Sequence, residues 1–275
     1  MLYPFRGPAY ETIIALPVYT NCDPCWRLFS LNSPPITPHP LTSHTLGTSQ
    51  SIVAGANLIF SPDMMHSLTA MNMLSPSSKC FSFDHRANGY SRGEGLGVLV
   101  LKRLTDALRD GNTIQAVIRA TGCNQDGNTP GITMPSPTSQ EALIRDTYSK
   151  AGLSMLPTRY FEAHGTGTAV GDPIESAALG RAFRTARSEK DPLIVGAVKS
   201  NIGHLEGAAG IAGVIKAVLV LQKGVIPPNT NFERINPKID AEFLRIKVSL
   251  LTYLTLVTHI PDYVGDMIRM RAGKC

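Results

Sequence analysis

Cysteine is scarce in this chain, and its use excludes a fold built on disulfides. Five cysteines in 275 residues form an odd, sparse set that is typical of a reduced, intracellular protein. Charged residues are also few, at 17% against 43% apolar residues, so we expect a sizeable core and not disorder. The net charge of +5 is too small to indicate nucleic-acid binding, and no Lys/Arg cluster contains interleaved aromatic residues. A mildly basic surface would suit an acidic partner.

Long hydrophobic runs are missing as well. The N-terminus has no basic region followed by an apolar stretch, so no signal peptide is expected. The longest apolar-leaning run, residues 248–260, is interrupted by polar residues and is too short to span a bilayer. We therefore expect a soluble, cytoplasmic protein that does not enter a membrane.

Glycine is nearly absent from the first 46 residues, where Gly7 is the single example. The same stretch is rich in proline, and its Pro34-Pro35 and Pro38-His39-Pro40 sequences exclude a continuous helix or a central strand. We expect residues 1–46 to be irregular and ordered structure to begin near residue 47.

From there the pattern of apolar residues alternates between strands and helices, which is typical of an α/β fold. Strands are predicted over residues 51–60, 95–101, 114–121, 160–163 and 193–198, and helices over 63–74, 105–110, 139–152 and 207–223. A further helix should begin at Asp172-Pro173-Ile174-Glu175, with Asp172 as N-cap and Pro173 at the first helical position.

Two histidines are the main candidates for chemistry. His164 and His204 each lie on a glycine-rich loop between a predicted strand and a predicted helix, and such loops bind ligands in α/β sheets. A neutral imidazole can donate or accept a proton near pH 7, so two of them on adjacent loops are suited to stabilising an enolate. Lys199 is placed to hold a carboxylate or orient a histidine, and Thr166 and Thr168 offer hydroxyls to an extended polar ligand.

These residues also resemble a known family, the ketosynthases (β-ketoacyl synthases), and within it the ketosynthase domains of type I polyketide synthases. Glu162 to Thr168 (EAHGTGT) and Val198 to Gly210 (VKSNIGHLEGAAG) look like the two histidine motifs of that family. Other segments agree in order along the chain, and they are residues 83–95, 124–127, 171–175 and 225–229. The resemblance runs from about residue 48 to about residue 240.

The resemblance implies a thiolase-like fold with α/β/α/β/α layers, here incomplete. It also implies decarboxylative condensation of a malonyl unit, carried on the phosphopantetheine of an acyl carrier protein, with an acyl thioester, as in polyketide and fatty acid biosynthesis. His164 and His204 would polarise the malonyl thioester, Lys199 would support them, and Thr166 and Thr168 would contact the phosphopantetheine. No cofactor or metal would bind directly, and the intact family forms homodimers.

Two departures qualify this expectation. The family's nucleophilic cysteine, in an Asp-Thr-Ala-Cys-type elbow, should fall near Phe29, where Cys25 has the bulky neighbours Trp26 to Phe29 instead. The family's closing glycine-rich motif is also missing after about residue 248. We expect residues 47–248 to form a partial ketosynthase domain, with a non-matching segment before it and a non-matching tail at residues 249–275. Such a fragment should not condense by itself.

Other interpretations remain open. Gly165-x-Gly167-x-x-x-Gly171 resembles a dinucleotide loop, but no acidic residue stands where a ribose would need it. Cys22-x-x-Cys25 with His39 and His44 has zinc-finger spacing, although the prolines around His39 oppose the helix required. A histidine near a strand end is commonly a satisfied polar residue, and a lysine such as Lys199 is commonly solvated. Glu206 is either a carboxylate that supports the site or a helix N-terminal charge, and the second interpretation is slightly favoured. Two alternatives to a catalytic role concern the whole chain. It is either a non-catalytic module that binds a carrier protein or dimerises, or a non-functional fragment that results from an incorrect gene model.

Overall fold

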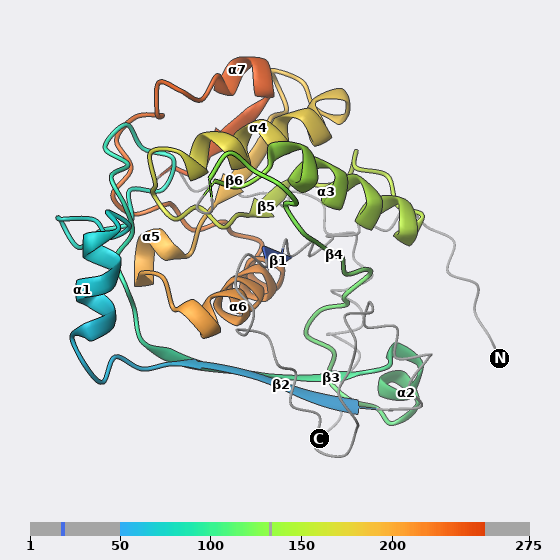
Figure 1. The fold of residues 1–275 in the computed structure, drawn as a ribbon. Coiled ribbons are helices and arrows are strands. Elements are labelled where there is room, and N and C mark those ends of the chain that lie inside the picture. The colour runs from blue at the N-terminus through green and yellow to red at the C-terminus, as the bar shows by residue number, and fades with distance from the viewer. Residues whose placement is uncertain (1–17, 20–49, 132–133, 251–275) are drawn as a thin grey trace.

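The computed structural model describes residues 18–19, 50–131 and 134–250. Almost all of the segment predicted to be irregular, residues 1–46, lies outside the described residues, and so does the predicted tail beyond Leu250. Within the described part, helices and strands alternate as predicted, and Figure 1 shows them stacked in layers.

The core lies around a parallel sheet in the order β5–β6–β7, formed by Tyr160–Glu162, Leu193–Gly196 and Ile246–Val248. Tyr160 pairs with Ile194 and Glu162 with Gly196, so both predicted strands end at the same edge. β6 is buried along its whole length, as expected for a central parallel strand that is covered on both faces. Three helices on one side share this core: α3 (Pro137–Ala151), α4 (Gly171–Phe183) and α7 (Ala241–Leu244).

The helix α6 (Ala209–Lys223) covers the other face of the sheet. Val220 of α6 packs with Tyr160 and Ile194 from the sheet, and Val214 packs with Leu99 on the opposite side of the helix. Leu99 belongs to an antiparallel ribbon of β2 (Gln50–Asn57) and β3 (Gly95–Lys102). The described residues therefore form four successive layers: helices, sheet, α6 and ribbon (Figure 1). Such layers are expected of an incomplete α/β/α/β/α fold.

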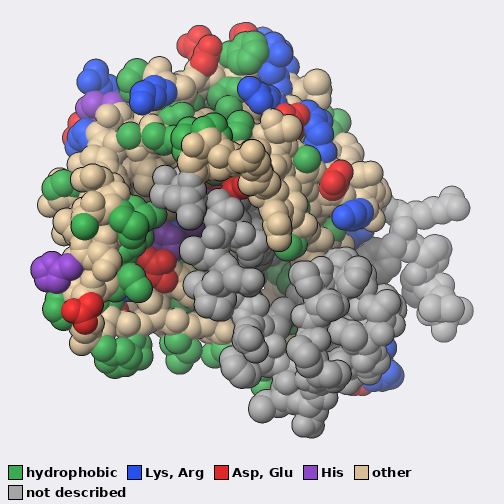
Figure 2. All heavy atoms as spheres, viewed as in Figure 1, with side chains coloured by type: hydrophobic (Ala, Val, Ile, Leu, Met, Phe, Trp, Pro, Cys, Tyr) green, Lys and Arg blue, Asp and Glu red, His purple; other side chains and the backbone are tan. Residues whose placement is uncertain are grey.

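The ribbon has one packed face and one bare face. Gly97 faces Ile211 of α6 so closely that any Cβ there would overlap it, and an added Cβ at Gly55 would meet Ala208 Cα at 3.3 Å. The opposite face carries six apolar residues that are largely exposed: Ile52, Ala54, Ala56, Leu96, Val98 and Val100. Figure 2 shows hydrophobic side chains along the lower edge of the molecule, where β2 and β3 run in Figure 1.

Most predicted boundaries are close to the observed ones, but one predicted strand is wrong. Residues 114–121 are irregular, and the nearby β4 (Cys123–Asn124) pairs only with β1 (Val18–Tyr19). A strand needs a neighbour for its hydrogen bonds, and the described residues supply none along 114–121. Short helices not predicted from sequence are α5 (Lys199–Ile202) and α7, while α1 (Asp63–Ala70) and α2 (Leu104–Arg109) lie where predicted. Among described residues, no helix combines the length and apolarity that crossing a membrane requires.

Candidate active site

The two candidate histidines lie next to each other. His164 follows β5 by two residues, and His204 lies after α5, which begins at Lys199 shortly after β6. Because β5 and β6 are parallel neighbours, both loops leave the same edge of the sheet. The ring centroids are 5.3 Å apart and the ring planes meet at 85°. Tertiary structure thus brings together the acid–base pair that the sequence suggested.

The loop that carries His164 is held by two carboxylates of α4. The backbone N–H groups of His164 and Gly165 donate to the two oxygens of Glu175 at 2.7 and 2.8 Å. Asp172 accepts from the N–H of Gly167 at 3.1 Å and from that of Phe83 at 2.7 Å. Gly167 has φ of +82°, and a Cβ there would lie 2.6 Å from the Phe81 nitrogen, so only glycine fits. The loop geometry is therefore fixed by buried acceptors and by glycine.

The predicted N-cap role of Asp172 is wrong. The helix α4 begins at Gly171, two residues before the predicted first helical position at Pro173, and Asp172 turns back into the loop to accept the hydrogen bonds above. Thr168 Oγ1 instead accepts the N–H of Gly171 at 3.1 Å, and it lies 3.3 Å from Thr166 Oγ1. The two threonines predicted to contact a ligand therefore lie together at the start of α4, with Thr166 buried.

His204 is oriented by the chain on both sides of it. Its Nδ1 accepts the N–H of Glu206 at 2.9 Å, so in the neutral ring the proton resides on Nε2. Its backbone N–H donates to Ser91 O at 2.8 Å, and its carbonyl accepts from Gly93. The Tyr90 ring lies 5.0 Å away, centroid to centroid. These contacts fix both the tautomer and the ring position.

Both histidines are kept neutral at pH 7. Burial, with the charges of Lys199 and Arg92, lowers the pKa of His204 to about 3. Burial, together with the charge of Lys199 and the nearby ring of His204, lowers the pKa of His164 well below its ordinary value. A neutral imidazole has one N–H to donate, which suits stabilisation of a developing oxyanion.

Lys199 is buried, not solvated. Lys199 is only 4% exposed. This burial lowers the pKa of its ammonium group, while the negative charges of Glu175, Glu162 and Asp172 act to raise it. Burial raises the pKa of Asp172 to about 7 and also raises that of Glu175, although backbone N–H groups donate to both. Lys199 thus places a basic group among buried carboxylates and next to the histidines.

Near His204 and Lys199, sequence reasoning assigned no role to Arg92, Tyr90 or Cys80, and it favoured a helix N-terminal charge for Glu206. Glu206 Oε1 lies 3.9 Å from Arg92 Nε, and the Glu206 carboxylate also interacts with the Tyr90 side chain. Glu206 therefore belongs to the surroundings of His204. Cys80 lines a pocket of about 450 Å³ together with Lys199 and Tyr90. Burial raises the pKa of this thiol, which opposes a nucleophilic role.

The remaining sequence hypotheses concern metals and cysteines. Cys22, Cys25, His39 and His44 all lie outside the described residues. In the part of the chain that is described, no group of three or more His, Cys, Asp or Glu residues is arranged to hold a metal ion. The described cysteines, Cys80 and Cys123, are free.

The layers and the paired histidines define an α/β protein with a histidine pair at the carboxyl edge of its parallel sheet, and comparisons with known proteins identify its family. The family model for the β-ketoacyl synthase N-terminal domain matches residues 46–107, and the model for the C-terminal domain matches residues 115–233. The chain belongs to the ketosynthase family, as found in the ketosynthase domains of type I polyketide synthases.

Similar proteins include fungal synthases and bacterial ketosynthase structures. The chain is 64% identical over 189 residues to highly reducing polyketide synthase NEC1 of Pyricularia oryzae, which covers 69% of the chain and 7% of the relative. It is 58% identical over 197 residues to highly reducing polyketide synthase 40 of Fusarium mangiferae, covering 72% and 8% respectively. The chain therefore spans less than a tenth of these relatives.

Among solved structures, the ketosynthase from module 6 of the bacillaene synthase of Bacillus subtilis superposes with a TM-score of 0.72 at 42% identity. The match covers 75% of this chain and 37% of that chain. An oxazolomycin ketosynthase domain from Streptomyces albus gives a TM-score of 0.71 at 35% identity, over 74% of this chain and 35% of that one. The thiolase-like fold inferred from the sequence resemblance is thereby confirmed.

Proposed function

We propose that this chain provides the enolate-stabilising half of a ketosynthase site, acting on a malonyl thioester carried on the phosphopantetheine of an acyl carrier protein. The observation that supports this function is the pair of neutral histidine rings, 5.3 Å apart, at the carboxyl edge of the sheet and near buried Lys199. The substrate, partner and pathway in polyketide biosynthesis follow from family membership and are part of the proposal.

The chemistry proceeds by breaking the bond between the malonyl carboxylate and its α-carbon. Carbon dioxide leaves, and the electron pair moves into an enolate whose negative charge rests on the thioester oxygen. The Nε2–H of His204 donates to that oxygen, and His164 supplies the second donor. A proton from solvent then converts the enolate to an acetyl thioester. In this scheme Lys199 holds the malonyl carboxylate until it leaves and orients His164, and Thr166 and Thr168 contact the phosphopantetheine arm.

Condensation needs a further group. In the family reaction, the enolate carbon attacks the carbonyl carbon of an acyl group that is held as a thioester on a cysteine. The cysteine then leaves as a thiolate. The sequence contains no Asp-Thr-Ala-Cys-type elbow, and the described Cys80 is a buried thiol whose pKa is raised. We therefore propose that the chain decarboxylates but does not condense on its own, and that it works in the cytoplasm, as part of a dimer where the rest of a ketosynthase is present.

The test measures carbon dioxide released from malonyl-carrier protein. Wild type should release it above background, and His204→Ala should lower the rate at least about 100-fold, the order of magnitude of a lost general acid–base group. His66→Ala, which removes an exposed histidine on α1, is the matched control and should leave the rate unchanged. Absence of release by folded wild type would refute the proposed function.

A second candidate, a non-catalytic binding or dimerisation module, is favoured by the bare apolar face of the ribbon. Leu96 and Val100 are 74% and 69% exposed on that face, and contiguous exposed apolar surface is typical of interaction sites or of aggregation-prone fragments. A pull-down with an acidic carrier protein, without turnover, would support this candidate. A cooperative melting transition of soluble protein would argue against the third interpretation, a fragment that does not fold.

A further inference from the structure

Glu162, the last residue of β5, links the two loops that carry the histidines. Its side chain is 7% exposed. One oxygen, Oε1, accepts the N–H of Val198 at 2.6 Å, and Val198 directly precedes Lys199. Glu162 itself stands two residues before His164. A single carboxylate thus fixes the exit of one loop relative to the start of the other.

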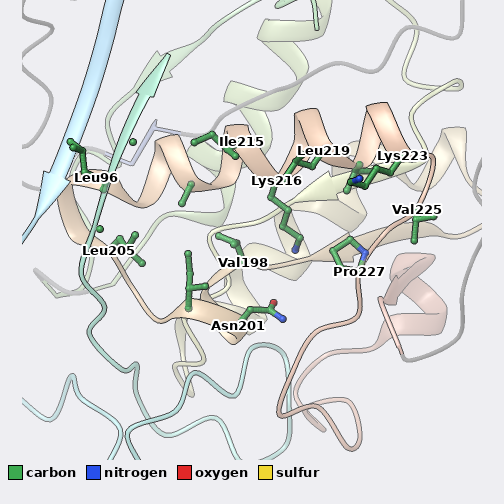
Figure 3. A pocket seen from close by; sticks show the side chains of 16 residues that line it. Leu96, Val198, Asn201, Leu205, Ile215, Lys216, Leu219, Lys223, Val225 and Pro227 are labelled. Carbon is green, nitrogen blue, oxygen red and sulfur yellow. The ribbon is translucent and has the colours of Figure 1, made fainter. Parts of the chain in front are cut away.

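The second oxygen of Glu162 binds groups from the sheet and from α6. Oε2 pairs with Lys216 Nζ at 2.9 Å, and the Tyr160 hydroxyl donates to it. Lys216 is a helix residue whose side chain is 8% exposed, and Figure 3 shows it reaching from α6 toward the segment that carries Val198. The pair therefore connects β5, α6 and the segment after β6.

The surrounding backbone leaves room for this ion pair. An added Cβ at Gly196, the end of β6, would lie 2.6 Å from the Tyr160 hydroxyl oxygen and 3.2 Å from Lys216 Nζ. A Cβ at Gly213 on α6 would lie 3.4 Å from Glu162 Cγ. Glycine on the strand thus makes space for the two charged side chains and their tyrosine partner.

The ion pair is poorly explained as a device for stability. Removing two charges from water costs about as much free energy as their attraction returns, and well-packed apolar residues often do as well. What this pair does provide is a defined geometry, because the carboxylate of Glu162 accepts hydrogen bonds from Val198 and Tyr160 and is paired in charge with Lys216. The negative charge of Glu162 also acts on Lys199, where it opposes the effect of burial. Glu162 thus acts on the His164 loop and on the Lys199–His204 segment, the two parts of the chain that carry the proposed enolate stabilisation.

We propose that Glu162 and Lys216 form a positioning pair that sets the His164 loop against the Lys199–His204 segment for enolate stabilisation. The inference rests on the proposed function and deepens it. Glu162 is not placed to touch the substrate; it acts through the backbone of Val198 and through the strand that leads to His164.

The first test compares decarboxylation of malonyl-pantetheine by Glu162→Gln, Lys216→Met and the double variant. Each single variant should lower kcat about tenfold or more, since a displacement of about 1 Å in a site can cost 100-fold, while KM changes less than about twofold. The double variant should be no worse than the poorer single variant, because both changes remove one linkage. Lys216→Arg keeps the charge and should restore part of the rate.

The matched control is Asp106→Asn. Asp106 lies on α2 and, like Glu162, is a carboxylate whose side chain is 7% exposed. It pairs with Arg109 on the same helix and with Arg103, the residue just before that helix. This variant removes a paired carboxylate outside the candidate site, so kcat should stay within about twofold of wild type. If Glu162 had a purely structural role, Glu162→Gln and Lys216→Met would both lower the melting temperature, but kcat of the folded variants would equal that of wild type.

A spectroscopic readout separates the two proposals. Imidazole nitrogen NMR signals of His164 and His204, assigned with His164→Asn and His204→Asn, should move in Glu162→Gln and Lys216→Met but not in Asp106→Asn. Unchanged histidine signals and unchanged kcat in a folded Glu162→Gln protein would overturn the positioning role. If wild type releases no carbon dioxide but the histidine signals respond to Glu162→Gln, the proposed function fails and the positioning pair stands.

Discussion

The two β-structures on either side of α6 differ in how completely they are covered. In the parallel sheet, Leu193 and Val195 of β6 are 0% and 1% exposed. In the antiparallel ribbon, Leu96 and Val100 of β3 are 74% and 69% exposed on the outer face, whereas Gly97 between them is buried against α6. Among the described residues, the sheet is covered by helices on both faces, whereas the ribbon is covered on its inner face only, by α6.

This difference shows that the described residues complete the packing around the parallel sheet but not around the ribbon. Both candidate histidines lie on loops that follow strands of the covered sheet, and the His164 loop is held by the buried acceptors Glu175 and Asp172. The ribbon supports the site indirectly, by packing on α6 and by the contact of Gly93, just before β3, with His204. Substitutions in the two regions should therefore have unequal effects.

The largest difference should come from equal truncations in the two structures. Leu193→Ala removes a fully buried side chain and should lower the free energy of unfolding by about 2–5 kcal/mol, because it leaves a cavity. Leu96→Ala removes a largely exposed one and should change it by less than about 0.5 kcal/mol. Urea denaturation followed by circular dichroism would measure both. Equal losses would show that the outer face of the ribbon is covered in solution.

The packed side of the ribbon should respond next most strongly. Gly97→Ala places a methyl group against Ile211 of α6, and such overpacking costs about 1–3 kcal/mol. Val98→Ala, on the outer face of the same strand, is the control and should cost much less. Ile211→Ala removes the overlapping Cγ2, so Gly97→Ala should cost less in the Ile211→Ala background than in wild type. A harmless Gly97→Ala would mean that the ribbon and α6 are not held together.

The pH dependence tests the sheet side of the comparison. Because the pKa of His204 is lowered from 6.5 to about 3, the unfolded chain binds a proton below pH 6.5 that the folded protein does not. The stability that neutral His204 provides is complete above pH 6.5 and is lost as the pH falls toward 3.

Relative to His204→Asn, wild type should therefore lose up to about 1.4 kcal/mol per pH unit below pH 6. Asp172, whose pKa is raised to about 7, acts in the opposite direction but is present in both proteins. His66→Asn is the control on an exposed histidine. Parallel stability curves for wild type and His204→Asn would contradict a buried, neutral His204.

The smallest effect on stability should come from making the bare face polar. Leu96→Thr with Val100→Thr should change the free energy of unfolding by less than about 0.5 kcal/mol, yet lower self-association seen by sedimentation velocity. Thr147→Val, a buried position on α3, serves as a comparison that leaves this face unchanged. Unaltered self-association would exclude the ribbon as the contact surface.

Much of the candidate site was predictable because its signals are local. Glycines next to His164 and His204, and strands before them, placed both residues on loops at the end of a sheet. Helix α3 ends at Ala151 and is capped by Gly152, whose φ of +64° suits glycine, and the predicted helix over residues 139–152 ends at the same place. The strand predicted over residues 114–121 failed because its β-branched pattern describes a preference, while a strand also requires a partner.

By itself, the sequence determined the order of the elements, the glycine-rich loops and the residues that provide the chemistry, since these depend on neighbours along the chain. Only the tertiary structure decided that Asp172 accepts the N–H of distant Phe83 as well as that of Gly167, and that Glu162 meets Lys216. Buried polar groups must find partners wherever the fold brings them, and those partners are set by packing between distant segments. The neutrality of both histidines has the same origin, because burial creates it.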